Sequence, residues 1–340
     1  NFFEDFSLGQ KFAHATPRTV TTGDVALYNA LYGPRFALQS SDDFARALGL
    51  ERAPVDDLIT FNMVFGKTVP DISLNAVANL GYADCRFQAR MYPGDTLSAA
   101  SEIIGLKENS SGKTGIVYVR STGKNGRGAT VLSLVRWVMV RKRDEAAPAP
   151  EASVPELPDS VEEISIPDGV DFERWDVARA GSAMRWIDYR PGERIDHING
   201  VTIEESEHMM ATRLWQNTAK VHFDQHAASQ ARFGRRLVYG GHIISLARAL
   251  SFNGFANAGL ISSINGGAHA NPAFAGDTIH AWSEVLERIE IPGRKDCGAL
   301  RLRTVAAKDL PCDDFPLKDA DGKYDPAVVL DLDYTVLVPR

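Results

Sequence analysis

Several features that mark other protein classes are missing from this chain of 340 residues. No apolar run approaches the roughly 20 residues that a membrane-spanning helix needs, so we expect no membrane partner. The opening Asn-Phe-Phe-Glu-Asp-Phe lacks the basic-then-apolar order of a signal peptide. The three cysteines are odd in number and show no C-x-x-C spacing, which favours free thiols in a reducing compartment. Together these absences predict a cytoplasmic protein.

An excess of basic charge is also missing, since 44 Asp and Glu outnumber 37 Lys and Arg. A net charge of −7 at pH 7 argues against nucleic acid as the main partner, although a local basic cluster can still hold a polyanionic ligand. His222 and His226 stand four residues apart, but no H-E-x-x-H motif or third ligand accompanies them, so we expect no metal site. The composition, 44% hydrophobic and 24% charged, is that of a globular protein long enough for two domains.

An internal repeat organises the chain. Shifting the sequence by 183 residues, with one later deletion, aligns Phe6 with Tyr189, Gly9 with Gly192, His14 with His197, Leu31 with Leu214, Val55 with Val238 and Gly94-Asp95-Thr96 with Gly276-Asp277-Thr278. The repeat predicts two related domains, over residues 1–142 and 166–340. Residues 143–165 between them are rich in proline, alanine and charge, which is typical of an extended linker.

Each copy shows the same order of secondary-structure signals. Apolar residues recur at helical spacing over residues 243–250, and the Phe-Asn-Gly at 252–254 provides a stop. Alternating, β-branched runs predict antiparallel strands over residues 116–119, 131–140, 300–303 and 328–338. One long helix followed by a run of strands, twice, predicts an α+β fold in which each sheet wraps its own helix.

The two copies differ where chemistry is expected. His222 aligns with Gln39, Asn217 with Pro34 and Asp224 with Ser41. Only the second copy therefore has titratable groups at these positions. We expect the second half to carry a catalytic site and the first half to help shape the pocket.

These segments resemble a known family. The second copy resembles the MaoC-type dehydratases of the hot-dog fold in three features. These are a lead-in glycine, an N/D-x-x-x-x-H-x-D block at 217–224, and a Val-x-x-Gly turn into a helix. Segments 24–28, 31–40, 53–57 and 233–243 read most like the mesaconyl-CoA hydratase (β-methylmalyl-CoA dehydratase) branch. The resemblance covers essentially the whole chain. It implies a tandem (double) hot-dog, a hydro-lyase acting on an acyl-CoA thioester, no cofactor beyond the coenzyme A of the substrate, and a homo-oligomer.

The wider family's block is Asp-x-Asn-Pro-x-His, in which Asp and His hold the water that is added or removed. Carried over by position, the histidine is His222, but the Asp position holds Asn217, and the Asn and Pro positions hold Ala219 and Lys220. The histidine matches and the carboxylate does not.

This departure limits the proton chemistry. His222 can act as base towards water and then as acid towards the α-carbon. Asn217 can orient the water but cannot exchange a proton at neutral pH. Asp224 is the nearest carboxylate in sequence and is a candidate to orient the imidazole, with helix capping as the alternative role. Gly240 and Gly241, at the start of the hydrophobic helix, are candidate backbone donors to the thioester oxygen.

Arginines are candidates for the two anionic parts of such a substrate. Arg235 and Arg236, with neighbouring Arg232, could bind the coenzyme A phosphates, although a solvated basic face is the alternative. Arg35, at the altered position of the first copy, and Arg213, one helical turn before Asn217, are candidates for a substrate carboxylate.

The leading hypothesis is reversible hydration of mesaconyl-CoA (2-methylfumaryl-CoA) to β-methylmalyl-CoA. Three alternatives remain: an (R)-specific hydratase for another enoyl-CoA, an acyl-CoA thioesterase, and a non-catalytic CoA-binding module. Thioesterases of this fold tend to use a carboxylate from the helix region. Asp56 and Asp57 of the first copy keep that alternative open.

Overall fold

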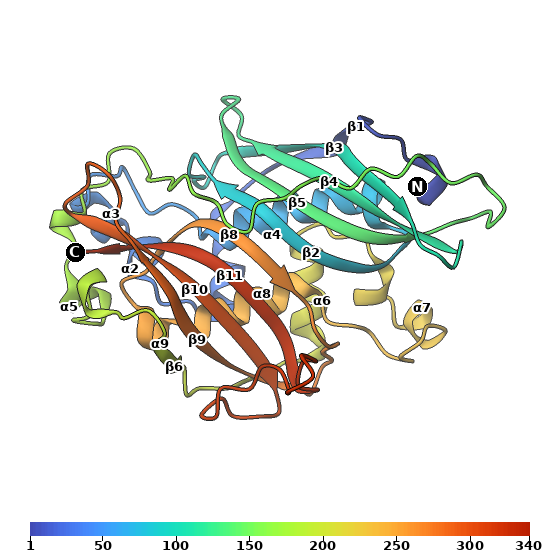
Figure 1. Ribbon diagram of the computed structural model, residues 1–340. Helices are drawn as coiled ribbons and strands as arrows, with labels where there is room; N and C mark the ends of the chain where they lie inside the picture. Colours follow the sequence, from blue (N-terminus) through green and yellow to red (C-terminus); the bar gives the residue numbers. More distant parts are fainter.

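The computed structural model describes residues 1–340 and contains one continuous antiparallel sheet of eleven strands (Figure 1). Neighbouring strands follow the order β1-β3-β4-β5-β2-β8-β11-β10-β9-β6, and β7 pairs with β9. The first half of the chain supplies β1 (Lys11–Thr19), β2 (Ala76–Phe87), β3 (Thr96–Glu108), β4 (Thr114–Lys124) and β5 (Thr130–Arg141). The second half supplies β6 (Arg194–Asp196), β7 (Val201–Thr202), β8 (Leu260–Ala268), β9 (Thr278–Ile289), β10 (Cys297–Lys308) and β11 (Val328–Pro339).

Nine α-helices accompany the sheet, and none has the length and apolar character needed to cross a membrane. They are α1 (Thr22–Tyr32), α2 (Ala37–Ser40), α3 (Asp42–Ala47), α4 (Asp57–Thr68), α5 (Val177–Ala180), α6 (Glu205–Leu214), α7 (Gln225–Ser229), α8 (Gly240–Leu250) and α9 (Phe252–Phe255). Shorter turns lie at Phe3–Asp5, Val69–Ser73, Phe172–Arg174, Trp186–Asp188 and Lys220–His222.

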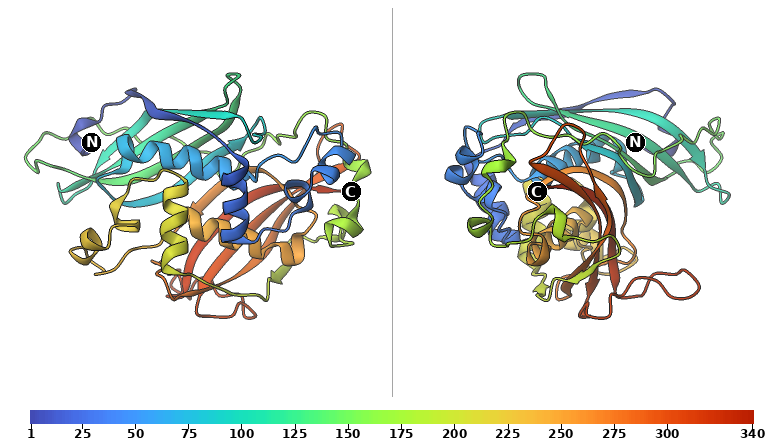
Figure 2. Two further views of the ribbon diagram at one scale, coloured as in Figure 1. Left: turned by 180° about the vertical axis from the view of Figure 1, so that it is seen from behind. Right: turned by 60° about the vertical axis from the view of Figure 1, so that its left-hand side comes forward.

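Each half of the sheet curves around one central helix. Helix α4 packs against β1, β3, β4 and β5, whereas α8 packs against β9, β10 and β11. Figure 2 shows the sheet bending around these helices, with α1 (blue) and α6 (yellow) on the side away from the sheet. The predicted α+β tandem hot-dog is confirmed by this arrangement. The halves meet where β2 pairs with β8, with Tyr82 opposite Gly267, so the sheet continues across the junction.

The central helices are buried on every side, not on the single apolar face that the spacing over 243–250 predicted. All residues of α4 are buried, as are residues 241–250 of α8. The sheet covers one face, and α1 and α6 contact α8 on another. Where the helices cross, Asn62 Nδ2 donates to Ser245 Oγ at 3.2 Å. These two residues occupy equivalent positions in the repeat, so the helices meet across its pseudo-twofold axis.

The same buried hydrogen bonds recur in both halves. His14 Nε2 lies 2.7 Å from Ser101 Oγ, which lies 2.7 Å from Ser121 Oγ. The second half repeats this chain with His197, Ser283 and Thr304, at 2.8 and 2.7 Å. Both histidines are therefore buried structural groups, placed alike by the repeat.

The segment 143–165 crosses the outer face of the sheet from one half to the other (Figure 1). Ser153 and Leu106 exchange two backbone hydrogen bonds, each 2.8 Å long. Further along, the Val161 N–H donates to Asn265 Oδ1 and the Ser165 N–H donates to Ser262 Oγ, both at 2.9 Å. The connection is thus anchored on both halves.

Candidate active site

His222 ends the short turn Lys220–His222, in the segment between α6 and α8. Its Nδ1 lies 2.8 Å from the carbonyl oxygen of Leu237. Because a carbonyl can only accept, Nδ1 carries the proton and Nε2 keeps its lone pair. Burial lowers the pKa of the imidazole to about 4, although the bond to Leu237 opposes that shift. At neutral pH the ring is therefore neutral and can take a proton from water at Nε2.

The start of helix α8 lies beside this imidazole. The ring of Tyr239, the residue before α8, meets the His222 ring edge-on with centroids 5.7 Å apart. No side chain caps α8, so its first backbone N–H groups are open to a ligand. Glycine is required at both first positions: a Cβ at Gly240 would lie 2.5 Å from the His269 ring, and one at Gly241 would overlap Asn62 Oδ1. The predicted oxyanion donors thus lie next to the predicted base.

A second imidazole borders the site. His269 follows strand β8, and its Nε2 lies 3.1 Å from the hydroxyl of Tyr82 on β2. Burial lowers the pKa of His269 to about 4, and nearby His222 lowers it further. The ring packs against Gly240 at the start of α8. His269 and Tyr82 therefore connect the second half to the first half.

The first half supplies the opposite wall of the site. The ring of Phe65, on α4, lies 5.6 Å from that of Tyr239 and 6.3 Å from that of Tyr82. The guanidinium of Arg136, on β5, lies 4.3 Å from the Phe65 ring. Arg136 also stands directly opposite Tyr82 in the β2–β5 pairing. Residues of both halves therefore pack around Tyr239, with His222 against its ring and Arg136 beyond the neighbouring ring of Phe65.

Several buried polar atoms along these walls have no partner within the chain. They are Asn62 Oδ1, Asn79 Nδ2, Arg136 Nε and the hydroxyl of Tyr239. Buried polar atoms are almost always hydrogen-bonded, because leaving one unpaired costs about 1–3 kcal/mol. Their unpaired state here is consistent with a site that a polar ligand or water completes.

Asn217 and Asp224, predicted beside His222, are engaged with the backbone. Asn217 is buried, and its Oδ1 accepts the N–H of Ala219 at 3.0 Å, whereas its Nδ2 donates to no group of the chain. Asp224 caps α7 by accepting the N–H of Ala227 at 3.0 Å. The prediction that Asp224 orients the imidazole is wrong in this structure, because the carbonyl of Leu237 fills that role.

The arginines predicted to bind substrate occupy different places. Arg35 lies 4.2 Å from the Phe252 ring and donates to Asn253 Oδ1 at 2.7 Å, beyond the last residue of α8. Eleven helical residues, about 16 Å, separate that end from Gly240, so Arg35 cannot contact a substrate there. Arg213 is exposed, which does not fit a buried pairing with a carboxylate.

The phosphate candidates differ from each other. Arg236 is paired with Glu205 and is therefore not free for coenzyme A. Arg235 is exposed, lies 4.6 Å from the Phe274 ring and donates to the carbonyl of Ala275 at 2.5 Å. Of the two, Arg235 stays a candidate for the phosphates.

The equivalent region of the first half holds no free base. Gln39 Nε2 donates to the carbonyl of Gly259 at 2.5 Å. Asp57 is paired with Arg90, and Asp56 caps α4 at the Leu58 N–H, 2.9 Å away. Burial and the neighbouring carboxylate raise the pKa of Asp56 to about 6. These contacts occupy both carboxylates that the thioesterase alternative requires.

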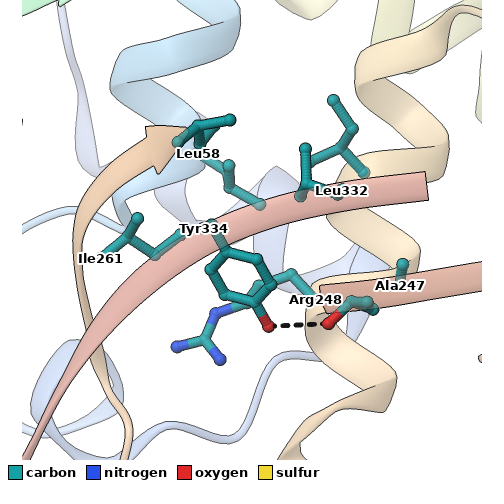
Figure 3. A pocket seen from close by; sticks show the side chains of 9 residues that line it. Leu58, Ala247, Arg248, Ile261, Leu332 and Tyr334 are labelled. Carbon is teal, nitrogen blue, oxygen red and sulfur yellow. Dashed lines mark hydrogen bonds between the residues drawn. The ribbon is translucent and has the colours of Figure 1, made fainter. Parts of the chain in front are cut away.

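A small enclosed cavity lies near this end of the central helices (Figure 3). Its lining includes Leu58 of α4, Ala247 and Arg248 of α8, and Leu332 and Tyr334 of β11. Its interior of about 10 Å³ holds at most one water, so no part of a larger ligand enters it.

No group of three or more His, Cys, Asp or Glu side chains lies close enough together to hold a metal ion. His226, four residues from His222, is exposed.

A sequence model of the family described as mesaconyl-CoA hydratase matches residues 1–316. The chain belongs to the mesaconyl-CoA hydratase family. It is 66% identical to a protein of Chloroflexus aurantiacus named beta-methylmalyl-CoA dehydratase, and 62% identical to one of Cereibacter sphaeroides named mesaconyl-CoA hydratase. Both alignments cover the whole chain, with 97% and 98% of the relatives.

Solved structures agree with this membership of the mesaconyl-CoA hydratase family. A putative MaoC domain protein dehydratase from Chloroflexus aurantiacus superposes with a TM-score of 0.98 at 66% identity, covering 100% of this chain and 97% of that one. A Mycobacterium tuberculosis protein described as having a double hotdog fold gives a TM-score of 0.79 at 24% identity, over 99% and 98% of the chains, and shows the fold alone. The resemblance found in the sequence is confirmed.

Several residues of the site were missed in the sequence, among them Tyr82, Arg136 and His269. Arg136 did leave a signal, because it is the one charged residue in the apolar strand run at 131–140. Tyr82 and His269 left none, since only the pairing of β2 with β8 brings them together.

Proposed function

We propose that the chain catalyses the reversible hydration of mesaconyl-CoA to β-methylmalyl-CoA. The observation that carries the proposal is the full-length match to two relatives whose names describe the two directions of this reaction. The geometry around His222 supports a hydro-lyase, because a neutral imidazole with an open Nε2 stands beside an uncapped helix start.

The addition begins with a proton transfer from water. His222 Nε2 takes the proton, and the oxygen of that water bonds to C3 of the 2-methylfumaryl group, the carbon β to the thioester. The bond from Nδ1 to the carbonyl of Leu237 holds the ring and stabilises the imidazolium that forms. Asn217 Nδ2 is the group we assign to orienting the water, since its Oδ1 is occupied.

Electrons displaced from the double bond collect on the thioester oxygen. The open N–H groups of Gly240 and Gly241 can donate to that oxygen, and the α8 dipole favours negative charge there. The proton then returns from His222 to C2, which completes the addition. Dehydration follows the same steps in reverse.

Other properties are part of the same proposal. No cofactor is needed, because each step uses the imidazole, backbone N–H groups and water. We expect the protein in the cytoplasm, where its three buried cysteines would stay free thiols. A homo-oligomer is expected from the resemblance, and the mass in solution tests it.

The decisive experiment follows enoyl-thioester absorbance of mesaconyl-CoA with the purified chain, while a thiol reagent reports free coenzyme A. Loss of absorbance without thiol release, and recovery from β-methylmalyl-CoA, is the expected result. Thiol release would instead identify a thioesterase. Binding without either change would identify a CoA-binding module, and faster turnover of crotonyl-CoA than of mesaconyl-CoA would indicate a hydratase for another enoyl-CoA.

A further inference from the structure

Arg136 is a buried cation without a counter-ion. The residue is 1% exposed, and its guanidinium forms no salt bridge with a carboxylate. Its Nη atoms donate only to neutral oxygens: Thr68 Oγ1 at 2.8 Å, Ser73 Oγ at 3.2 Å and Asn79 Oδ1 at 3.4 Å. Its Nε has no partner at all. Buried charges are normally paired, because losing hydration without a counter-charge is unfavourable.

The other buried arginines do not combine these features. Arg90 is paired with Asp57. Arg248 donates to Ser251 Oγ at 3.2 Å and to the carbonyl of Ala258, and none of its nitrogens is buried without a partner. The second half has a related pair with the residue types exchanged: the guanidinium of Arg248, on α8, lies 6.0 Å from the ring of Tyr334, on β11. Arg248 donates to a backbone carbonyl, whereas Arg136 donates only to side-chain oxygens and keeps an unpaired Nε.

Two further unpaired groups near Arg136 can donate hydrogen bonds. Asn79 Nδ2 and the Tyr239 hydroxyl are buried without acceptors. Asn79 contacts Arg136 through its Oδ1. Burial and the nearby Tyr82 raise the pKa of the Tyr239 phenol, and the charge of Arg136 acts in the opposite direction. A set of buried donors around an unpaired guanidinium has the chemistry of a receptor for an anion.

This donor set borders the site of the proposed reaction. Aromatic contacts lead from Arg136 over Phe65 to Tyr239 and on to His222. A second path runs from Arg136 to Tyr82, its cross-strand neighbour, and through the Tyr82 hydroxyl to His269. Arg136 is therefore connected to His222 through two intervening rings, those of Phe65 and Tyr239.

We propose that Arg136, with Asn79 and Tyr239, binds the free carboxylate at C4 of the 2-methylfumaryl group. The inference rests on the proposed function, because it names the part of that substrate which the first half recognises. C4 is attached to C3, the carbon that receives the hydroxyl, so a carboxylate held there fixes C3 relative to His222. An enoyl-CoA that ends in a methyl group would leave the guanidinium unpaired and would be rejected.

The test compares two substrates in two variants. Wild-type protein is expected to favour mesaconyl-CoA over crotonyl-CoA in kcat/KM by about 100-fold or more, since a site built for a polar group excludes an analogue without it. Arg136→Met should remove most of that preference, with the loss falling on mesaconyl-CoA. Arg248→Met, the matched control, replaces a buried arginine lacking an ion pair and should leave the ratio unchanged. A folded Arg136→Met that keeps the wild-type ratio would overturn the inference.

A second measurement uses the wild-type protein alone, in case Arg136→Met does not fold. Succinyl-CoA and butyryl-CoA are saturated, and only the first has a carboxylate at C4. Succinyl-CoA is expected to inhibit hydration at a concentration at least about tenfold lower than butyryl-CoA. Equal inhibition by the two compounds would contradict the proposed carboxylate-binding role. If the wild-type protein does not hydrate mesaconyl-CoA at all, the proposed function fails. If it does and the ratio survives in Arg136→Met, only the role of Arg136 fails.

Discussion

Replacing His222 with alanine tests the assignment of the base. With its pKa lowered to about 4, the imidazole is almost entirely neutral at pH 7, so the substitution removes a base that is fully available. Positioned proton transfer contributes roughly 10²- to 10⁴-fold to rates. The expected loss in kcat is therefore about 3–5 kcal/mol of transition-state stabilisation.

The effect on folding should be much smaller. The variant loses one hydrogen bond, to the carbonyl of Leu237, which is worth about 1 kcal/mol at a half-buried position. Steady-state hydration of mesaconyl-CoA gives kcat, and thermal unfolding gives the stability. Gln39→Ala, at the equivalent position of the first half, is the control and should cost less than about tenfold, since that side chain bonds only to Gly259. A folded His222→Ala with less than a tenfold loss, or an equal loss in Gln39→Ala, would refute the reasoning.

Three further predictions concern the surroundings of this base. Protonation disables the base, and the pKa of His222 is about 4. We therefore expect kcat/KM to stay level from pH 8 to about 5.5 and to fall only in more acidic buffer. A decline centred at the ordinary histidine pKa, near 6.5, would contradict this prediction. Asp224→Ala should lower the free energy of unfolding by about 1 kcal/mol, because α7 loses its cap, and should leave the pH profile of kcat/KM unchanged. A shifted profile would show that Asp224 acts on His222. Gly241→Ala should lower kcat and reduce the free energy of unfolding by about 1–3 kcal/mol, because the added methyl group overlaps Asn62. Gly23→Ala is the matched control for the unfolding measurement, since its Cβ would meet no atom closer than 3.4 Å.

The sequence alone predicted much of the fold, because each half encodes it separately. The apolar spacing over 243–250 and the strand runs at 131–140 and 328–338 lie within α8, β5 and β11. The repeat also shows that position 222 differs from position 39, which marks the histidine. Such signals are local in the chain or come from comparing its two copies, and no tertiary contact is needed to find them.

The partners of His222 were harder to predict, since they depend on contacts between distant segments. Asp224 is only two residues away, but its carboxylate turns to the first N–H groups of α7. Leu237, which orients the imidazole, was not predicted because its contribution is a backbone carbonyl. Arg136 was visible in the sequence as a charge in an apolar strand. That it lacks a counter-ion emerges only when α4, β2 and β5 are packed around it.

The pairing of β2 with β8 joins two copies of one unit within a single polypeptide. A homodimer of identical units would have to repeat every substitution, so a residue suited to one pocket would also appear in the other. Covalent linkage removes that constraint. Gln39 and His222 can differ, and an arginine can stand on β5 while β11 keeps tyrosine and leucine. The chain can therefore keep the two-sided architecture of a dimer while each side is altered independently for a substrate whose two ends are unlike.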